Sequence, residues 1–248
     1  MFINCKMAVL MLVLTLDGQV HSGGIIGGHE AKAHSRPYMA VLERHMPDNS
    51  TEFCDGFLLN EDFVMTAAHC QAKSFNVLLG VHNFHNKKGV QNLSVTEAFP
   101  HKDYNATDKS NVQNDIMLLK LSSKAELNDH VKGIDLADKE NDHLPNSCIV
   151  SGWGKTGNSH YNSLILMEVN VTLTKNKLCD GRKLYCSEGN AGPAKGDSGG
   201  PLVCDQKAYG LVSHNRVENH TKVYMYTKIP DYKDWINITQ HNGKFSYM

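Results

Sequence analysis

The sequence predicts an all-β protein whose short strands form a sandwich or a barrel. Short apolar runs separated by turn residues continue through most of the chain, as is typical of these folds. In one run, Val169, Val171 and Leu173 alternate with polar residues, as expected of a half-buried strand. The runs that predict strands are 57–59, 77–81, 116–121, 148–150, 166–173, 202–204, 209–212 and 223–229.

Only the C-terminal end has a helical pattern. Tyr232, Trp235, Ile236 and Thr239 would share one face of a helix that begins after Pro230. The pattern therefore predicts one C-terminal helix on an otherwise β-rich chain.

The organisation of the chain favours one large domain. The 248 residues contain no internal repeat, low-complexity tract or coiled-coil heptads, and all-β barrels often reach this length. The polar segment 129–145 has little strand signal. We expect it to connect two halves of the domain.

The charge of the chain excludes some partners. Its formal net charge is −1, so no basic excess indicates a nucleic acid partner and no acidic tail indicates a disordered segment. The 14 histidines would add positive charge as the pH falls through about 6.5.

The N-terminus has the pattern of a secretory signal. Lys6 precedes an apolar stretch, 7–16, and small residues follow near Ser22. The stretch is shorter than the roughly 20 residues that a membrane span requires. We therefore expect residues 1–22 to be a signal peptide, the mature protein to be secreted, and no membrane span.

The cysteines fit an exported protein. Removal of the signal removes Cys5 and leaves six cysteines, an even number that favours disulfides in an oxidising compartment. Their spacing matches no zinc-binding pattern, and their number alone leaves the pairing open. Six Asn-x-Ser/Thr sequons predict glycosylation: Asn49, Asn92, Asn105, Asn170, Asn219 and Asn237.

Ser198 is the candidate nucleophile. Glycines surround it in the segment 196–200, where they permit a tight turn with outward N–H groups. A serine needs an adjacent base, and the oxyanion formed by its attack on a carbonyl needs donors. The segment also fits the Gly-x-Ser-x-Gly pattern of an unrelated hydrolase fold, in which the acid and the histidine follow the serine.

That second chain order can be tested against the sequence. Its candidates would be Asp205, Asp231 or Asp234 as the acid and His214, His220 or His241 as the base. The chain shows no alternation of strands and helices, which that fold requires.

The other chain order places a histidine and an aspartate before the serine. His69 ends an apolar strand and adjoins Cys70, and Asp115 opens the strongly apolar run 116–121. A carboxylate at the edge of a core needs a partner, and a histidine that donates its Nδ1–H would satisfy it. We therefore predict His69, Asp115 and Ser198 as catalytic residues.

Five motifs together resemble the trypsin-like serine proteases. They occur in the order of that family and span the chain from Ile25 to the C-terminal helix: Ile25-Ile26-Gly27-Gly28, Ala67-Ala68-His69-Cys70, Asp115-Ile116-Met117-Leu118, Ser151-Gly152-Trp153-Gly154 and Gly196-Asp197-Ser198-Gly199-Gly200-Pro201. The resemblance implies a trypsin-like fold: two packed six-stranded antiparallel β-barrels with a C-terminal helix, and a catalytic triad in the cleft between them.

The resemblance also assigns roles to further residues. It implies that Ser198 is the nucleophile, His69 the general base and then acid, and Asp115 the residue that orients His69, with the backbone N–H groups of Gly196 and Ser198 as the oxyanion hole. It implies the disulfides Cys54–Cys70, Cys148–Cys204 and Cys179–Cys186. Ala194 stands where most of the family has a cysteine, a departure that resembles the granzyme and mast-cell protease branch.

The same branch suggests how the enzyme is activated. Only Gly23 and Gly24 separate the expected signal from Ile25, which resembles the dipeptide propeptide that a dipeptidyl peptidase removes from granzymes. The freed Ile25 ammonium would then pair with Asp197 beside the nucleophile. The expected division of the chain is thus a signal peptide 1–22, an activation dipeptide 23–24 and a protease domain 25–248.

The resemblance places the primary specificity pocket at Gly192, Ser213, Asn215 and Tyr224. Gly192 supplies no acid to bind Arg or Lys, and Asn215 and Tyr224 would narrow the mouth and fill the floor. We expect a shallow pocket for small or medium uncharged residues.

The predicted function is a secreted or granule-stored serine endopeptidase that cleaves peptide bonds through an acyl-enzyme. The alternative is an inactive or weakly active protease homologue with an obstructed pocket that acts as a binding protein. The expected partners are protein or peptide substrates, an activating dipeptidyl peptidase, protease inhibitors and granule proteoglycan. No metal or organic cofactor is implied. The expected location is secreted, with storage in cytoplasmic secretory granules.

Overall fold

The computed structural model describes residues 25–108, 112–138, 144–145, 147–155 and 161–245. The expected signal peptide and activation dipeptide lie outside the described residues. Within this part of the chain, no helix is both long and apolar enough to cross a membrane.

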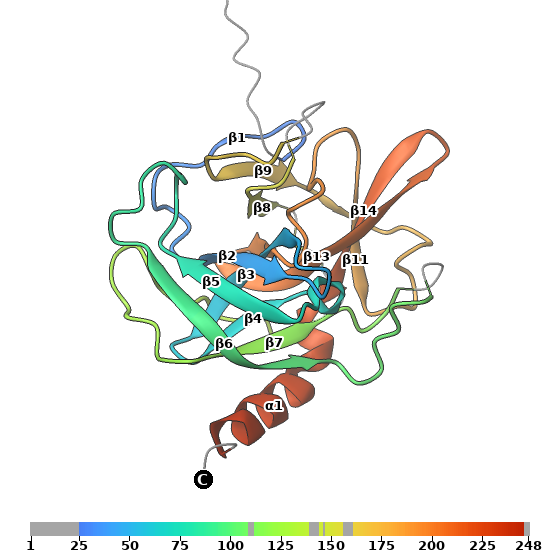
Figure 1. Cartoon of the computed structure of the whole chain (residues 1–248). Coiled ribbons are helices and arrows are strands. Elements are labelled where there is room, and N and C mark those ends of the chain that lie inside the picture. The colour runs from blue at the N-terminus through green and yellow to red at the C-terminus, as the bar shows by residue number, and fades with distance from the viewer. Residues whose placement is uncertain (1–24, 109–111, 139–143, 146, 156–160, 246–248) are drawn as a thin grey trace, which may run out of the picture.

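The N-terminal half is a closed six-stranded barrel (Figure 1). Its strand order is β2-β3-β4-β7-β6-β5, and all its pairings are antiparallel. The strands are β2 (Met39–His45), β3 (Thr51–Asn60), β4 (Phe63–Thr66), β5 (Ser74–Leu79), β6 (Gln91–Pro100) and β7 (Met117–Leu121). Its interior is filled by buried aliphatic residues, among them Leu42, Leu58 and Leu119.

The C-terminal half is an eight-stranded antiparallel sheet of order β1-β9-β8-β12-β13-β14-β11-β10. The strands are β1 (His29–Glu30), β8 (Cys148–Gly152), β9 (Met167–Val171), β10 (Leu173–Thr174), β11 (Leu184–Glu188), β12 (Pro201–Cys204), β13 (Lys207–Glu218) and β14 (Thr221–Lys228). Only Thr172 separates β9 from β10, yet these strands lie towards opposite ends of the strand order. The sheet therefore curls until β9 and β10 form one bent strand, and without the two-residue β1 this leaves six principal strands.

The expected fold class is confirmed, including the single C-terminal helix α1 (Lys233–Phe245). Two short 3₁₀ helices also occur, η1 (Ala68–Cys70) and η2 (Ile229–Tyr232). Tyr232 and Ile236 are buried with Phe57, Phe63 and Leu211 in a cluster that joins both halves to the helix. The helix thus packs with residues from both halves.

The segment between β7 and β8 connects the halves, as the sequence predicts. Ile134 donates its backbone N–H to Leu58 of the barrel, and Ala137 donates to Ala208 of the sheet. The far end of the β13–β14 hairpin extends away from the body (Figure 1), and Val217 near its tip is exposed.

Candidate active site

Strand pairing brings His69 and Asp115 together. His69 lies in η1, which follows β4, and Asp115 lies two residues before β7. These strands pair antiparallel with Thr66 opposite Met117, so the end of β4 meets the start of β7. A disulfide between Cys54 of β3 and Cys70 then fixes η1 to the barrel.

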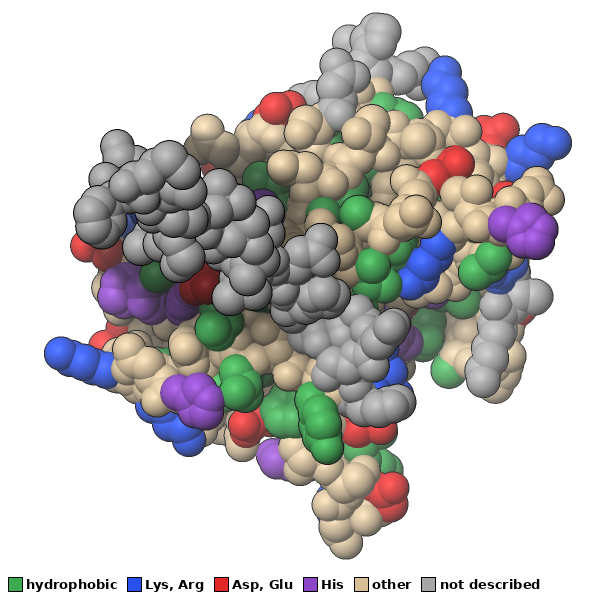
Figure 2. Space-filling view, turned by 90° about the horizontal axis from the view of Figure 1, so that it is seen from above, with side chains coloured by type: hydrophobic (Ala, Val, Ile, Leu, Met, Phe, Trp, Pro, Cys, Tyr) green, Lys and Arg blue, Asp and Glu red, His purple; other side chains and the backbone are tan. Residues whose placement is uncertain are grey.

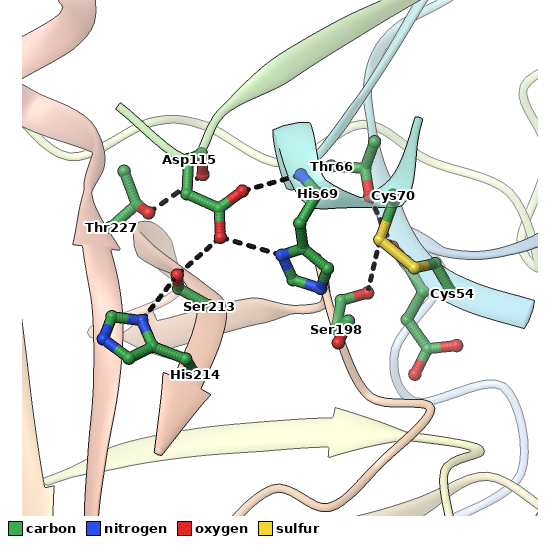
Figure 3. Close-up of polar contacts among 10 residues, drawn as sticks. Cys54, Thr66, His69, Cys70, Asp115, Ser198, Ser213, His214 and Thr227 are labelled. Carbon is green, nitrogen blue, oxygen red and sulfur yellow. Dashed lines mark hydrogen bonds and ion pairs between the residues drawn. A yellow bond between two sulfur atoms is a disulfide. The ribbon is translucent and has the colours of Figure 1, made fainter. Parts of the chain in front are cut away.

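Asp115 is buried, with 1% of its surface exposed, and its carboxylate accepts three hydrogen bonds (Figure 3). The backbone N–H of His69 donates to Oδ1 at 2.8 Å, and Nδ1 of the same residue lies 2.8 Å from Oδ2. The Ser213 hydroxyl also donates to Oδ2. Because the carboxylate accepts, Nδ1 carries the proton, and the other ring nitrogen, Nε2, is left to act as a base.

The surroundings of Asp115 favour its ionised form. Burial acts to raise the pKa of this carboxyl, but the His69 ring and the hydrogen bonds from His69 and Ser213 outweigh burial and lower it. Thr227 donates to the Asp115 carbonyl at 2.9 Å and fixes its backbone. The site therefore holds a negative charge behind the imidazole, which would stabilise an imidazolium.

Ser198 lies in the loop that precedes β12 of the C-terminal sheet. Its carbonyl accepts the Asp55 N–H at 2.9 Å, and the Gly199 N–H donates to Val212 at 2.8 Å. Gly199 has φ +80°, and a Cβ there would lie 2.0 Å from Thr66 Oγ1, so only glycine fits. Figure 3 shows the His69 ring between Asp115 and Ser198.

Asp197, next to Ser198, is fully buried. Its Oδ1 accepts the Gly154 N–H at 2.7 Å, and its Oδ2 accepts the Ala194 N–H at 2.6 Å. Ile25 is 1% exposed, and Ile26 exchanges two backbone hydrogen bonds of 2.9 Å with Gly192. The start of the expected protease domain therefore enters the C-terminal half beside the loop that carries Asp197.

The four expected pocket residues come from two neighbouring regions. Asn215 on β13 pairs with Tyr224 on β14, and a Cβ on Gly192 would lie 2.6 Å from the Tyr224 ring. Tyr224 is 1% exposed and its hydroxyl has no hydrogen-bond partner among the described residues, whereas Asn215 is exposed. The Ser213 hydroxyl donates its hydrogen bond to Asp115.

Sequence reasoning missed two features of this region. One is the role of Ser213 as a donor to Asp115, which joins positions 98 residues apart and has no local signal. The other is Asp55, an acid that is 2% exposed on β3 and whose Oδ2 accepts the Trp153 N–H at 3.1 Å. An aspartate between Cys54 and the apolar run 57–59 was a signal that could have identified it.

One group of metal-ligand side chains occurs near the site within the described residues: Cys54, His69 and Cys70. The two cysteines are bonded to each other, so they offer no thiolate to a metal. All three disulfides, Cys54–Cys70, Cys148–Cys204 and Cys179–Cys186, are the pairs that the family resemblance implies.

The fold and this site define a class of protein: a two-part β protein in which a buried carboxylate orients a histidine between itself and a serine, as in serine hydrolases. The Trypsin family model matches residues 25–236, and the chain belongs to this family.

Relatives and a solved structure agree with that assignment. Granzyme B of Rattus norvegicus is 40% identical, covering 94% of this chain and 98% of its own, and Mast cell protease 3 of Ovis aries is 42% identical, covering 95% and 96%. A solved structure described as "Structure of GrC" has a TM-score of 0.77 at 35% identity, covering 88% of this chain and 100% of its own. The chain is a trypsin-like serine endopeptidase that acts on proteins or peptides.

Proposed function

We propose that Ser198 is the nucleophile of this endopeptidase, His69 its general base and acid, and Asp115 the residue that orients His69. The observation that carries this assignment is the buried Asp115 carboxylate, which holds both the backbone and the ring of His69 at 2.8 Å. That arrangement fixes the tautomer required for proton transfer from Ser198.

The proposed reaction has two halves. Ser198 Oγ attacks the scissile carbonyl while His69 Nε2 takes its proton, and the proton then passes to the leaving amine. Water, activated by the same His69, releases the acyl group. The N–H groups of Gly196 and Ser198 would bind the oxyanion, and Gly196 has φ +109°, which glycine adopts readily.

Activation is proposed to follow removal of residues 1–22 as a signal and then of Gly23–Gly24 by a dipeptidyl peptidase. The new Ile25 ammonium would pair with Asp197. The burial of Ile25 and the two backbone N–H groups that hold the Asp197 carboxylate support this, because an ion pair in that position needs a fixed partner.

The proposed specificity is for small or medium uncharged residues before the scissile bond. Tyr224 lies against Gly192 and would limit the depth of the pocket, and neither residue supplies a charge for Arg or Lys. Strong cleavage after Arg, with poor cleavage after Ala, Val, Leu and Met, would contradict this proposal.

The close approach of Tyr224 to Gly192 also favours the second candidate function, a binding homologue with an obstructed pocket. Labelling of Ser198 by an acylating reagent would distinguish the two. A homologue that only binds should resist acylation, whereas an enzyme with a narrow pocket should still react.

Secretion and granule storage are likewise proposed. All six sequon asparagines have exposed side chains, which supports glycosylation of an exported protein.

Acidic and basic side chains are interspersed on the face shown in Figure 2, so binding to granule proteoglycan would depend on histidine protonation. Equal proteoglycan affinity at acidic and neutral pH would contradict that dependence. Protease inhibitors are further proposed partners.

The experiment that tests the proposed function is turnover of a peptide library by the recombinant chain beginning at Ile25. The library varies the residue before the scissile bond, and Ser198→Ala is the matched control. Cleavage that is abolished in the control supports the assignment. Equal cleavage by the control, or none by the folded parent chain, contradicts it.

A further inference from the structure

A second buried acid lies beside Asp197. Asp55 on β3 is 2% exposed and Asp197 is fully buried. A Cβ atom added to Gly152 would lie 2.2 Å from Asp197 Oδ1 and 2.5 Å from Asp55 Oδ2. The two carboxyl oxygens are therefore no further apart than the sum of these distances. Both side chains face Gly152 at the end of β8.

The two carboxyl groups have unequal support. Asp197 accepts N–H groups at 2.7 and 2.6 Å, one on each oxygen, whereas Asp55 accepts the Trp153 N–H at 3.1 Å. Within the described chain, no lysine, arginine or histidine side chain forms an ion pair with either acid. The shorter bonds favour the negative charge on Asp197.

Two ionised carboxylates at this spacing, shielded from water, repel each other strongly, so such a pair retains a proton. Burial, and then the neighbouring Asp197, raise the pKa of Asp55 well above its usual value. Burial also raises the pKa of Asp197, to about 6, against the hydrogen bonds from Ala194 and Gly154.

The surrounding elements supply few other titratable groups. β4 contains no titratable side chain, and the only one in β8, Cys148, is in a disulfide. On β2, the residue opposite Asp55 is Val41, which carries no charge. β14 supplies the Tyr226 hydroxyl, whose raised pKa is due first to burial and in smaller part to Asp197. The remaining group would be the amine of a processed Ile25.

We propose that Asp55 is a positioning residue of the activation pocket, where it retains a proton beside Asp197 and so leaves one negative charge to receive the Ile25 ammonium. This inference rests on the activation mechanism proposed above. As the pH rises, Asp55 releases its proton to solvent, and the pocket then holds two carboxylates around one ammonium. The second carboxylate keeps the ammonium protonated to higher pH, and with it the active conformation of the Ser198 loop.

The test uses Asp55→Asn in the chain that begins at Ile25. Asparagine retains the shape and the acceptor for the Trp153 N–H but cannot become negative. We expect the alkaline limb of the kcat/KM–pH profile to move to lower pH by at least about one pH unit. A shift of this size is the effect on the pKa of an ammonium of losing one nearby negative charge. Asp129→Asn is the matched control, because the Asp129 side chain is 99% exposed, and it should leave the limb in place.

A second measurement does not require that variant to be active. In the Ser198→Ala chain, labelled at the aspartate carboxyl carbons, nuclear magnetic resonance should show one aspartate still protonated at neutral pH. Asp55→Asn should remove that signal. A parent chain with every aspartate ionised at neutral pH, or an alkaline limb that Asp55→Asn does not move, would overturn the inference.

Asp197→Asn separates this inference from the activation mechanism. Full activity of Asp197→Asn would contradict the Ile25–Asp197 pair itself. Loss of activity in Asp197→Asn with an unchanged alkaline limb in Asp55→Asn would contradict only the role of Asp55.

Discussion

At the scale of single residues, the charge on Asp115 depends on hydrogen bonds from two parts of the chain. His69 belongs to the N-terminal barrel, whereas Ser213 belongs to β13 of the C-terminal sheet. The hydrogen bond from Ser213 helps to lower the pKa of Asp115. A carboxyl group whose pKa is lower in the folded than in the unfolded protein stabilises the fold at pH values above its unfolded pKa. This stabilisation is lost as the pH falls through the folded pKa.

Ser213→Ala should therefore destabilise the fold in a pH-dependent way. At neutral pH the loss should be about 1.5–3 kcal/mol, the usual contribution of a hydrogen bond to a charged group. The pKa of Asp115 should rise, so on acidification its stabilising effect should be lost at higher pH than in the parent. Urea unfolding of the Ser198→Ala background at several pH values measures this.

Ser163→Ala is the matched control for that prediction. The buried Ser163 hydroxyl donates to a backbone carbonyl at 2.7 Å and contacts no acid by hydrogen bond in the described residues. Its cost should not depend on pH. The same pH profile for both variants would contradict the role given to Ser213.

His214 provides a second pH-dependent prediction. Burial, opposed by Asp115 and assisted by Arg216, lowers the pKa of His214 to about 4. Between pH 6.5 and 4 the unfolded chain binds this proton and the folded chain does not, so His214 makes the fold less stable as the pH falls through that range. His214→Gln should reduce the fall in Tm over that range.

The exposed His220 on the β13–β14 hairpin provides a comparison. His220→Gln should leave the pH dependence of Tm close to that of the parent. If both variants behave alike, then the burial of His214 is not the cause of the slope.

Residues in compact motifs could be predicted, and residues that meet across the fold could not. His69 and Ser198 lie among characteristic neighbours in the sequence. Asp55 was missed because its importance arises only where β3 meets the end of β8, a contact between residues 98 positions apart. The Ser213 hydrogen bond to Asp115 was missed for the same reason.

At the scale of elements, strands identified from sequence, such as β7 and β12, have buried residues that form short apolar runs. β6 was missed because its residues alternate between half-buried and exposed, and none of its side chains is fully buried. β13 and β14 extend beyond the runs 209–212 and 223–229 into a hairpin with little apolar pattern.

The disulfide Cys54–Cys70 links residues 16 positions apart and attaches η1, which contains both Cys70 and His69, to β3. Replacing both cysteines by alanine should cost about 3 kcal/mol of stability and should lower kcat more than it raises KM, because His69 loses its anchor. Cys179–Cys186 closes only seven residues, away from the triad. Its removal should cost about 2 kcal/mol and leave kcat nearly unchanged. Equal effects on kcat would contradict this distinction.

At the scale of the whole molecule, the proposed triad joins two halves that each have their own core. The overall architecture could be predicted because the family motifs span nearly the whole chain. The division of the second half into eight strands could not be predicted, since it depends on local features such as the break at Thr172 between β9 and β10.

The proposed activation is a property of the whole molecule, because it requires the N-terminus of the domain to reach the loop beside Ser198. A chain that retains Gly23–Gly24 should cleave peptides more slowly than one that begins at Ile25, by a factor on the order of 10² or more. This is the range for loss of an oxyanion-hole donor. Rates of peptide hydrolysis for the two chains measure this. Equal rates would contradict the proposed pairing of Ile25 with Asp197.

The measurement that tests the central claim most directly is stoichiometric labelling of the chain beginning at Ile25 with a small serine-acylating reagent, read by mass spectrometry of its peptides. One label on Ser198, absent in Ser198→Ala and much slower to form in His69→Ala, is the predicted result. A folded chain that takes up no label, or takes it up elsewhere at an equal rate, would contradict the assignment of Ser198, His69 and Asp115.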